Sequence, residues 1–429
     1  MGLLGVGLCG LLAAVAGSVL LARLLRDSAR PWSGAVLGAV FCTADVVSGR
    51  TTFALGLATG LAALLALPRR RTTVLWAVLT ALLSPVAAAF LGLAATALVL
   101  CRRPGGWPLG LAASAPVLAV ALTFPTAGIQ PYRADDVRYP LYAALGLLLL
   151  ARAVPVVRVA AGLYGVAVVG LLATQDPFGS NITRLAVLFA APLLVALVRT
   201  PRLLVLPLAL ILLDWQSGPL RADLRATDPP QTATLVRALA DLRVHRVEVV
   251  PLRNHVEASE VAPAVPLARG WSRQVDAERN RLFYRDSLSP QDFRAWLAAN
   301  AVDAVALAPG ALTDAAGRPE RDLLLAGRVP GLQEVWTDGT WTVWRVLGTR
   351  PLADGPVEVQ GADRTTLHLR AMGPGTSAVA VRWSPWLSVQ GPACLRRDGD
   401  EVELELSGAG EVVLGSSLRP RGSCPGAKA

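Results

Sequence analysis

The first 214 residues of the chain contain no glutamate and no lysine, although they hold 16 arginines and 6 aspartates. The rest of the chain carries 25 basic and 25 acidic residues, so the whole formal net charge of +10 belongs to the first part. Nucleic-acid-binding proteins gather lysine, arginine and aromatic residues on one soluble face. Here the arginines instead separate long apolar runs, and Lys428 is the only lysine. No nucleic-acid partner is predicted.

Several catalytic motifs that can be read directly from a sequence are also missing. The chain has no Walker loop, no G-x-S-x-G and no H-E-x-x-H. These absences exclude a P-loop nucleotidase, an α/β-hydrolase elbow and a zincin-type peptidase. The three histidines, His245, His255 and His368, are scattered, and we interpret them as exposed or capping residues. No cofactor is predicted, and a divalent metal is left as an open alternative.

The N-terminus lacks the basic start and small-residue cleavage site of a signal peptide, so a membrane-spanning helix is predicted there. A helix needs about 20 apolar residues to cross a bilayer. The stretch 73–101 is too long for one span, and proline ends a helix, so two helices are predicted to meet at Ser84-Pro85. Residues 1–214 therefore predict a polytopic bundle of roughly ten helices. The other candidate spans are 2–22, 33–49, 52–67, 107–124, 139–151, 159–174, 185–198 and 203–214.

The arginines predict how these spans are oriented in a plasma membrane. Arginine and lysine accumulate in cytoplasmic loops. If the spans alternate, 12 arginines fall on one side and four on the other, so the side with 12 is predicted to be cytoplasmic. Everything after Asp214 is then outside the cytoplasm. The four outer arginines are Arg50, Arg133, Arg138 and Arg184.

The predicted outer loops collect most of the polar residues of the bundle, namely Asp135, Asp136, Asp176, Asn181 and Arg184. Asp45 lies just inside the outer end of its span. An ionisable residue within a span is costly and is functional by default. The alternative is that Asp45 pairs with Arg50 or Arg184 and holds the bundle together.

The second half of the sequence predicts two further domains. Residues 215–350 alternate strand and helix signals, which indicates a small α/β domain. Residues 351–429 contain short alternating strands between glycine, proline and aspartate, which is typical of a β-sandwich. Cys394 and Cys424 both fall in this part, and a disulfide between them is expected if it is extracytoplasmic.

One segment of the predicted α/β domain, 253–284, is dense in polar and aromatic residues. It includes Arg269, Trp271 and Asn280. A long irregular segment inside a compact domain is usually functional or packs on something. Trp271 with its neighbouring arginines suits a sugar face and an anionic phosphate. The alternative is that this segment docks the domain onto the outer loops of the bundle.

Several motifs together resemble a family of bacterial polytopic membrane proteins of unassigned function, sometimes loosely termed major-facilitator transporters. The architecture of that family is similar to that of GT-C glycosyltransferases. The resemblance covers most of the chain. It is carried by Ser48 to Gly56, Ser84-Pro85-Val86-Ala87, Asp176 to Asn181 with Thr183-Arg184-Leu185, Pro266 to Trp271, Asn280, Leu282-Phe283-Tyr284 and Trp296-Leu297.

The GT-C resemblance implies transfer of a sugar from a polyprenyl-phosphate donor at the outer membrane face. It implies that Arg50, Arg133 and Arg184, with Asn181, hold the donor, and that a carboxylate deprotonates the acceptor hydroxyl. In GT-C enzymes this acid lies in the first outer loop. Because the first span here begins outside, that loop is expected to be missing, which leaves Asp45, Asp135 and Asp136 as the candidate catalytic residues.

Two other functions stay open at this point. A membrane transporter is one, although the spans show no evident two-fold repeat. A non-catalytic envelope assembly protein, whose outer domain binds an envelope glycan or a protein partner, is the other. For all three functions, the lipid bilayer is a predicted partner.

Overall fold

The computed structural model describes residues 3–124, 128–174, 176–199, 202–225, 229–285, 287–363 and 365–425. These residues form two compact units, Met1–Arg225 and Ala226–Ala429, which we call unit 1 and unit 2. Unit 1 is helical, and unit 2 combines helices with three β-sheets.

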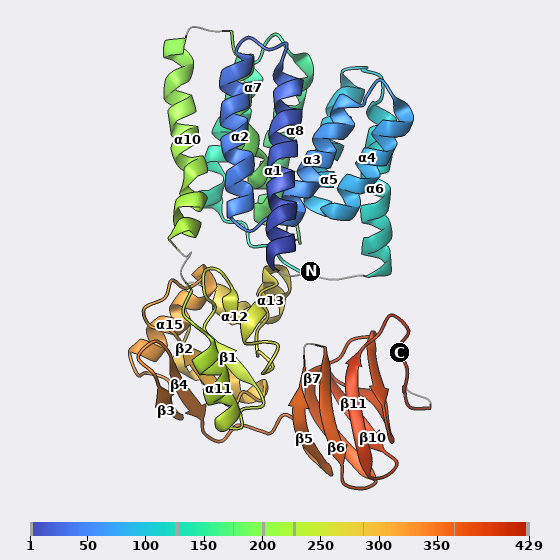
Figure 1. Cartoon of the computed structure of the whole chain (residues 1–429), viewed down its shortest axis with the longest axis vertical. Coiled ribbons are helices and arrows are strands. Elements are labelled where there is room, and N and C mark those ends of the chain that lie inside the picture. The colour runs from blue at the N-terminus through green and yellow to red at the C-terminus, as the bar shows by residue number, and fades with distance from the viewer. Residues whose placement is uncertain are drawn as a thin grey trace. The chain divides into compact units, whose positions relative to one another are not determined.

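Unit 1 is a bundle in which helices run side by side in alternating directions (Figure 1). Each predicted span contains one helix. The break in 73–101 is confirmed, because Ser84 ends one helix and its Oγ accepts a hydrogen bond from the Ala87 amide, which caps the next helix. The helices are α1 (Leu3–Leu25), α2 (Pro31–Val47), α3 (Thr51–Leu65), α4 (Arg70–Leu83), α5 (Pro85–Leu100), α6 (Gly106–Thr123), α7 (Arg138–Leu150), α8 (Pro155–Gly170), α9 (Thr183–Leu197) and α10 (Arg202–Leu224).

Among the described residues, four helical segments are long and apolar enough to cross a membrane, namely Leu4–Leu25, Gly106–Thr123, Pro155–Ala173 and Gly179–Leu197. Shorter apolar helices are Pro31–Val47, Thr51–Leu65 and Pro85–Leu100. Exposed leucine and valine side chains cover α1 and α6, as expected for helices that face lipid. These features are consistent with a membrane localisation.

The helix that contains the last predicted span, 203–214, does not end at Asp214. α10 continues to Leu224, although its composition becomes polar after Asp214. The Arg221 guanidinium bonds to the Asp214 carboxylate at 2.8 Å across two turns, and Gln216 Nε2 donates to the Ala186 and Val187 carbonyls. The change in composition therefore marks a change in the helix surface and not the end of the helix.

Close helix packing in unit 1 depends on small residues. A Cβ added at Gly34 in α2 would lie 2.5 Å from the Ala196 Cβ and 3.0 Å from the Pro192 carbonyl oxygen in α9. Small residues let helix backbones approach closely where apolar burial gives little preference for protein over lipid. The α2–α9 contact keeps the start of α9 near the end of α2, which matters for the site below.

The α/β part of unit 2 contains one four-stranded sheet in the order β1 (Val247–Val249), β2 (Ala304–Leu307), β4 (Thr342–Val346), β3 (Leu332–Thr337). β1 and β2 are parallel, and β3 and β4 form a hairpin that turns at Asp338-Gly339. Helices α11 (Ala233–Asp241), α14 (Pro290–Ala299) and α15 (Arg318–Leu325) pack through apolar residues on the cores of the two sheet faces. Shorter helices are α12 (Val256–Glu260) and α13 (Arg273–Arg279).

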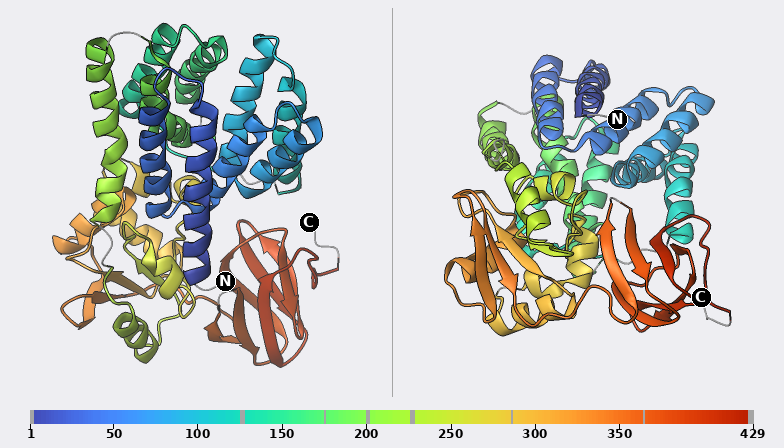
Figure 2. Two further views of the ribbon diagram at one scale, coloured as in Figure 1. Left: turned by 45° about the horizontal axis from the view of Figure 1, so that its top comes forward. Right: turned by 60° about the horizontal axis from the view of Figure 1, so that its bottom comes forward.

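The C-terminal part of unit 2 is β-rich. One sheet has the order β7 (Gly375–Arg382), β10 (Glu401–Leu406), β9 (Ala393–Asp398), and the other β5 (Val357–Ala362), β6 (Thr366–Ala371), β11 (Gly410–Ser416), β8 (Leu387–Gln390). The two sheets share one apolar core and lie face to face (Figure 2). Five strands fall where alternation predicts them. β8 and β9 were not predicted, because each shows too few alternating apolar residues.

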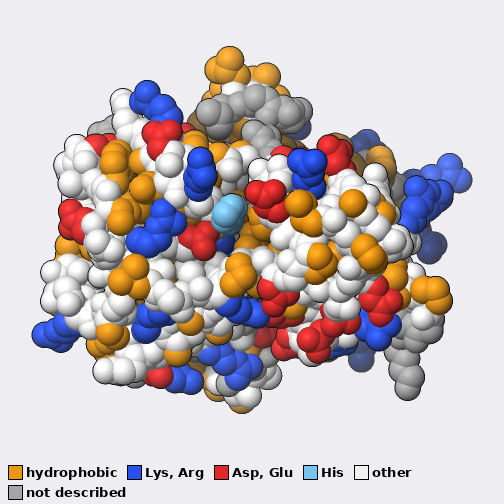
Figure 3. Space-filling view, turned by 90° about the horizontal axis from the view of Figure 1, so that it is seen from below, with side chains coloured by type: hydrophobic (Ala, Val, Ile, Leu, Met, Phe, Trp, Pro, Cys, Tyr) orange, Lys and Arg blue, Asp and Glu red, His pale blue; other side chains and the backbone are white. Residues whose placement is uncertain are grey.

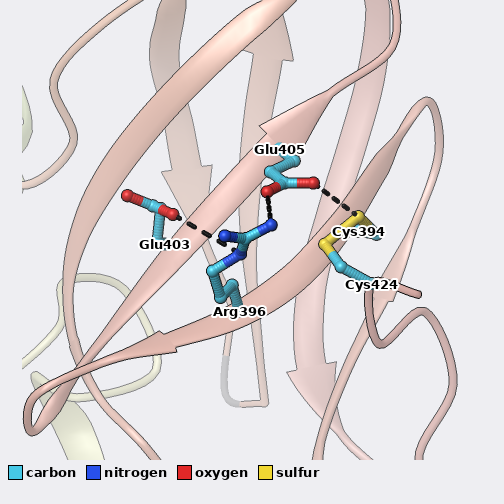
Figure 4. The surroundings of a disulfide bond; sticks show 5 residues. All are labelled: Cys394, Arg396, Glu403, Glu405 and Cys424. Atoms are coloured by element: carbon cyan, nitrogen blue, oxygen red, sulfur yellow. Dashed lines mark hydrogen bonds and ion pairs between the residues drawn. A yellow bond between two sulfur atoms is a disulfide. The ribbon is translucent and has the colours of Figure 1, made fainter. Parts of the chain in front are cut away.

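A disulfide joins Cys394 in β9 to Cys424 near the C-terminus (Figure 4). Arg396 lies beside it and pairs with Glu403 and Glu405 on the neighbouring strand. Glu405 and both cysteine sulfurs lie close enough together to suggest metal ligands. Because the sulfurs are bonded to each other, they offer no thiolate, and we assign no metal there.

Candidate functional site

Three charged residues that the sequence singles out meet at one end of unit 1. Asp45 near the end of α2 pairs with Arg50, which precedes α3, at 3.4 Å between Oδ1 and Nη1. Arg184 in the first turn of α9 lies within electrostatic range of Asp45, and its guanidinium carbon lies 5.2 Å from the centre of the Phe53 ring. The Asp45 side chain is only 3% exposed. The cluster Asp45–Arg50–Arg184 therefore carries two positive charges for one carboxylate.

The second carboxylate oxygen of Asp45 is an open acceptor. Asp45 Oδ2 is buried and has no hydrogen-bond partner among the residues that the structure describes. A buried carboxylate oxygen without a donor is costly, and such an atom is retained where another group comes to it. This atom is the strongest candidate in unit 1 for a proton acceptor.

An apolar cavity of about 420 Å³ lies inside the same bundle. Side chains from α1, α3, α5, α7, α8 and α9 line it. Its wall includes Leu185 and Ala186, which follow Arg184 directly, and Phe90, whose ring meets Phe53 edge-on at 6.2 Å. The Phe53 ring thus contacts both Arg184 and Phe90, a residue of the cavity wall. An apolar chamber and a cationic cluster are neighbours in this unit.

The loop that leads into α9 is held by Asp176. Its Oδ1 accepts hydrogen bonds from the Phe178 and Gly179 amides, and Gln130 bridges to this loop through the Asp176 carbonyl. Burial alone would raise the pKa of Asp176, but bonds from the Thr174 hydroxyl and these amides keep it below its ordinary value. Asp176 is thus a loop-forming residue and not a free acid.

Position 179 in the same loop requires a glycine for a steric reason. It has a φ of +37°, and an added Cβ would lie 1.9 Å from the Gln130 carbonyl oxygen. Only glycine permits this approach. The contact joins the loop before α7 to the segment before α9. That segment contains Asn181, which is buried and precedes Arg184 by three residues.

Asp135 and Asp136 belong to a separate turn. They form the exposed 3-10 helix η1 (Ala134–Asp136), in which Asp136 Oδ2 accepts a hydrogen bond from the Arg133 amide at 3.4 Å. Within the described ranges, no hydrogen bond or ion pair joins either aspartate to Asp45. The structure therefore brings together Asp45, Arg50 and Arg184 but not Asp135 or Asp136 with them.

In unit 2, Arg269 is the centre of a buried charge cluster. Its guanidinium pairs with Glu248 at 2.8 Å, Glu320 at 2.6 Å and Asp276 at 3.7 Å, and its central carbon lies 3.6 Å from the centre of the Phe283 ring. Every one of the four charged side chains is at most 7% exposed. The cluster Arg269–Glu248–Glu320–Asp276 carries three carboxylates for one cation.

This excess of carboxylates changes the acid–base behaviour of the glutamates. Burial raises the pKa of Glu320 to about 7, with Arg269 opposing it, and raises the pKa of Glu248 well above its ordinary value. Because like charges this close do not both ionise easily, a proton stays with the pair near neutral pH. Binding a proton lowers the excess negative charge of the cluster.

The other two candidates in unit 2, Asn280 and Trp271, differ in their exposure. Asn280 is buried, donates to Asp276 Oδ1 at 2.8 Å and accepts from the Trp296 indole at 3.0 Å. Trp271 is 66% exposed. It borders a small polar pocket of about 20 Å³ together with Pro251, Glu257, Arg273 and Asp314.

Sequence reasoning missed Glu248, Glu320 and Asp314. Glu248 did leave a signal, because it is the one acid in the apolar segment RVEVVPL (246–252). All three residues of β1, Val247–Val249, are buried. A charged residue in a strand covered on both faces requires a buried partner. Glu320 and Asp314 lie in loops and helix starts where acids are ordinary, and no local pattern distinguishes them.

Comparison with protein-family models, with curated proteins and with solved structures found no match. The architecture and the two charge clusters are therefore the basis for a functional assignment. They define a protein with a helical unit suited to a membrane and a second unit that has an α/β part and a β-rich C-terminal part.

Proposed function

We propose that the protein is a GT-C-like membrane glycosyltransferase, which takes a sugar from a polyprenyl-phosphate-linked donor at the outer face of the plasma membrane and serves envelope glycan assembly. The observation that carries this proposal is the apolar cavity of about 420 Å³ beside the Asp45–Arg50–Arg184 cluster. Such a pair of features matches a ligand with an apolar chain and an anionic head.

The cluster suits the phosphate of the donor. Guanidinium groups form charge-assisted hydrogen bonds with phosphate oxygens. The cluster has one positive charge beyond what Asp45 compensates, so an anion would neutralise it. Arg184 is held against Phe53, which fixes its position before the ligand arrives. The isoprenoid chain of the donor would lie in the cavity beyond Phe53 and Phe90.

Asp45 is the proposed base. In the transfer step, the acceptor hydroxyl oxygen bonds to the anomeric carbon, the bond from that carbon to the phosphate oxygen breaks, and polyprenyl phosphate leaves. The hydroxyl proton passes to Asp45 Oδ2, the open acceptor. Arg50 and Arg184 would stabilise the negative charge on the departing phosphate.

The orientation belongs to the same proposal. The loops after α1, α3, α5, α7 and α9 hold most of the arginines, which favours a cytoplasmic position. The Asp45–Arg50–Arg184 cluster lies at the other end of the helices and would face the outer leaflet. Unit 2 follows α10 and would also lie outside, where the Cys394–Cys424 disulfide is stable.

The test is binding of decaprenyl phosphate, without a sugar, to the full chain in lipid nanodiscs. We expect Arg184→Met to weaken binding by roughly tenfold or more, since a charge-assisted phosphate contact is lost. Arg138→Met is the matched control, because Arg138 is an exposed arginine at the same end of the bundle that stacks on Tyr139. Equal affinities for the wild type and both variants would refute the proposal.

A further inference from the structure

The small pocket beside Trp271 lies where ligands commonly bind in an α/β domain. Pro251 and Glu257 follow β1, and Asp314 follows β2, and these two strands are parallel. Ligands bind outside the carboxyl ends of parallel strands, because loops from neighbouring strands converge there. The volume of about 20 Å³ admits one group the size of a water molecule.

Two buried polar atoms at this pocket lack partners, and they are complementary. Arg269 Nη1 is a donor and Glu257 Oε2 is an acceptor, and neither has a hydrogen bond to any described residue. Both residues line the pocket, and both side chains are at least nine-tenths buried. A hydroxyl group has the complementary chemistry for both atoms, since its oxygen accepts from an N–H such as Nη1 and its hydrogen is donated to a carboxylate oxygen such as Oε2.

Charge at the pocket argues for a neutral ligand. Three carboxylates line it, Glu257, Asp276 and Asp314, against two arginines, so the lining has no excess of arginine charge for an anion. Arg269 is already paired with Glu248 and Glu320. Arg273 is already paired with Asp314 at 2.5 Å. For a cation, the described residues offer no group of three metal-ligand side chains here with suitable spacing. A polyhydroxylated neutral molecule fits both the hydroxyl-sized space and the charges.

Trp271 supplies an apolar surface for such a ligand. Its side chain is 66% exposed although it is large and apolar, and it lines the mouth of the pocket. An indole face packs well against the apolar C–H face of a sugar ring, while the ring hydroxyls remain free to bond at the edge.

We propose that this pocket is a carbohydrate-binding subsite, in which a sugar ring stacks on Trp271 and one of its hydroxyls enters between Arg269 Nη1 and Glu257 Oε2. The site lies wholly within unit 2 and needs no transfer reaction in unit 1. It therefore goes beyond the proposed transferase activity, and it can be tested separately from lipid binding.

The experiment is saturation-transfer NMR on the full chain in a detergent without sugar headgroups. The probes are the methyl glycosides of glucose, galactose, mannose and arabinose, each added alone. We expect transfer to at least one probe. Trp271→Ala and Glu257→Gln should each weaken its apparent affinity by about tenfold or more. Trp32→Ala is the matched control, because Trp32 is an 83% exposed tryptophan of unit 1.

Two possible results of the same titrations would contradict the proposal. No transfer to any of the four probes would overturn the proposal and leave a structural water as the occupant of the pocket. Equal affinity in wild type, Trp271→Ala and Glu257→Gln would also overturn it. Trp271 is exposed, so a loss caused by misfolding is not expected for that variant, and decaprenyl phosphate binding by each variant checks unit 1.

Discussion

Unit 1 and unit 2 each contain an arginine cluster, and the two clusters have opposite charge balances. In unit 1, Arg50 and Arg184 face one carboxylate, Asp45. In unit 2, Arg269 faces three carboxylates, Glu248, Glu320 and Asp276. A buried cluster with excess positive charge favours an anion, whereas one with excess negative charge favours a proton. The excess positive charge in unit 1 therefore suits an anion, whereas in unit 2 the Arg269 guanidinium is largely paired with carboxylates and only Nη1 remains open for the proposed sugar hydroxyl.

The two clusters also differ in their surroundings. The Asp45–Arg50–Arg184 cluster borders an apolar cavity, and Arg50 is 29% exposed at its side chain. The Arg269 cluster is packed under Phe283 with every charged side chain nearly inaccessible. The face shown in Figure 3 mixes exposed acidic and basic side chains, whereas the charged groups of the Arg269 cluster are buried.

The largest expected effect comes from removing the unit 2 arginine. Arg269→Met should destabilise unit 2 by about 3–5 kcal/mol, because it leaves three buried carboxylates without a cation. Hydrogen exchange of peptides covering β1 and β2 in the full chain measures this local stability. In contrast, Arg184→Met should leave exchange in both units near the wild-type level, since it removes the excess charge of unit 1. Similar hydrogen exchange in Arg269→Met and in the wild type would contradict the difference that we infer between the two clusters.

A smaller effect should appear in the pH dependence of unit 2. Because burial holds the pKa of Glu320 near 7, above its ordinary 4.5, the folded state keeps a proton that the unfolded state has lost. This contribution to stability should therefore be fully present below about pH 4.5 and be lost, by roughly 3 kcal/mol, as the pH rises to about 7. Above that pH, this contribution should be constant.

Glu320→Gln is the variant that sharpens this pH prediction. It removes the titrating group but keeps a side chain of the same shape next to Arg269. Exchange in β1 and β2 peptides should become less dependent on pH between 4.5 and 7. Glu260→Gln is a suitable control, since Glu260 belongs to unit 2 but not to the Arg269 cluster. An unchanged pH slope in Glu320→Gln would contradict the assignment of the proton to this cluster.

Much of the secondary structure was predictable from the sequence, because apolar runs and their breaks are local signals. Ser84-Pro85 ends one helix and caps the next, and the alternation in 401–406 gives β10. The end of α10 was not predictable from composition, because Arg221 and Asp214 extend the helix by a side-chain contact. Local patterns do not encode such contacts.

The site was predictable only in part, for the same reason. The pairing of Asp45 with Arg50 was one of two alternatives, and five residues of sequence separate them. Two of the three carboxylate partners of Arg269, Glu248 and Glu320, lie 21 and 51 residues away, and their position depends on the sheet and on α15. A sequence pattern shows that Arg269 and Trp271 are close neighbours. It does not show that the first is buried and the second exposed.

The most direct test of the account is photo-crosslinking of a polyprenyl phosphate that carries a diazirine on its chain to the full chain in nanodiscs. Mass spectrometry of the peptides would locate the adducts. We expect adducts on the cavity wall, at Phe90, Leu185 and Phe189, and loss of these adducts in Arg184→Met. Adducts confined to outward-facing leucines such as Leu11 and Leu118, and unchanged in Arg184→Met, would contradict a lipid-phosphate site in unit 1.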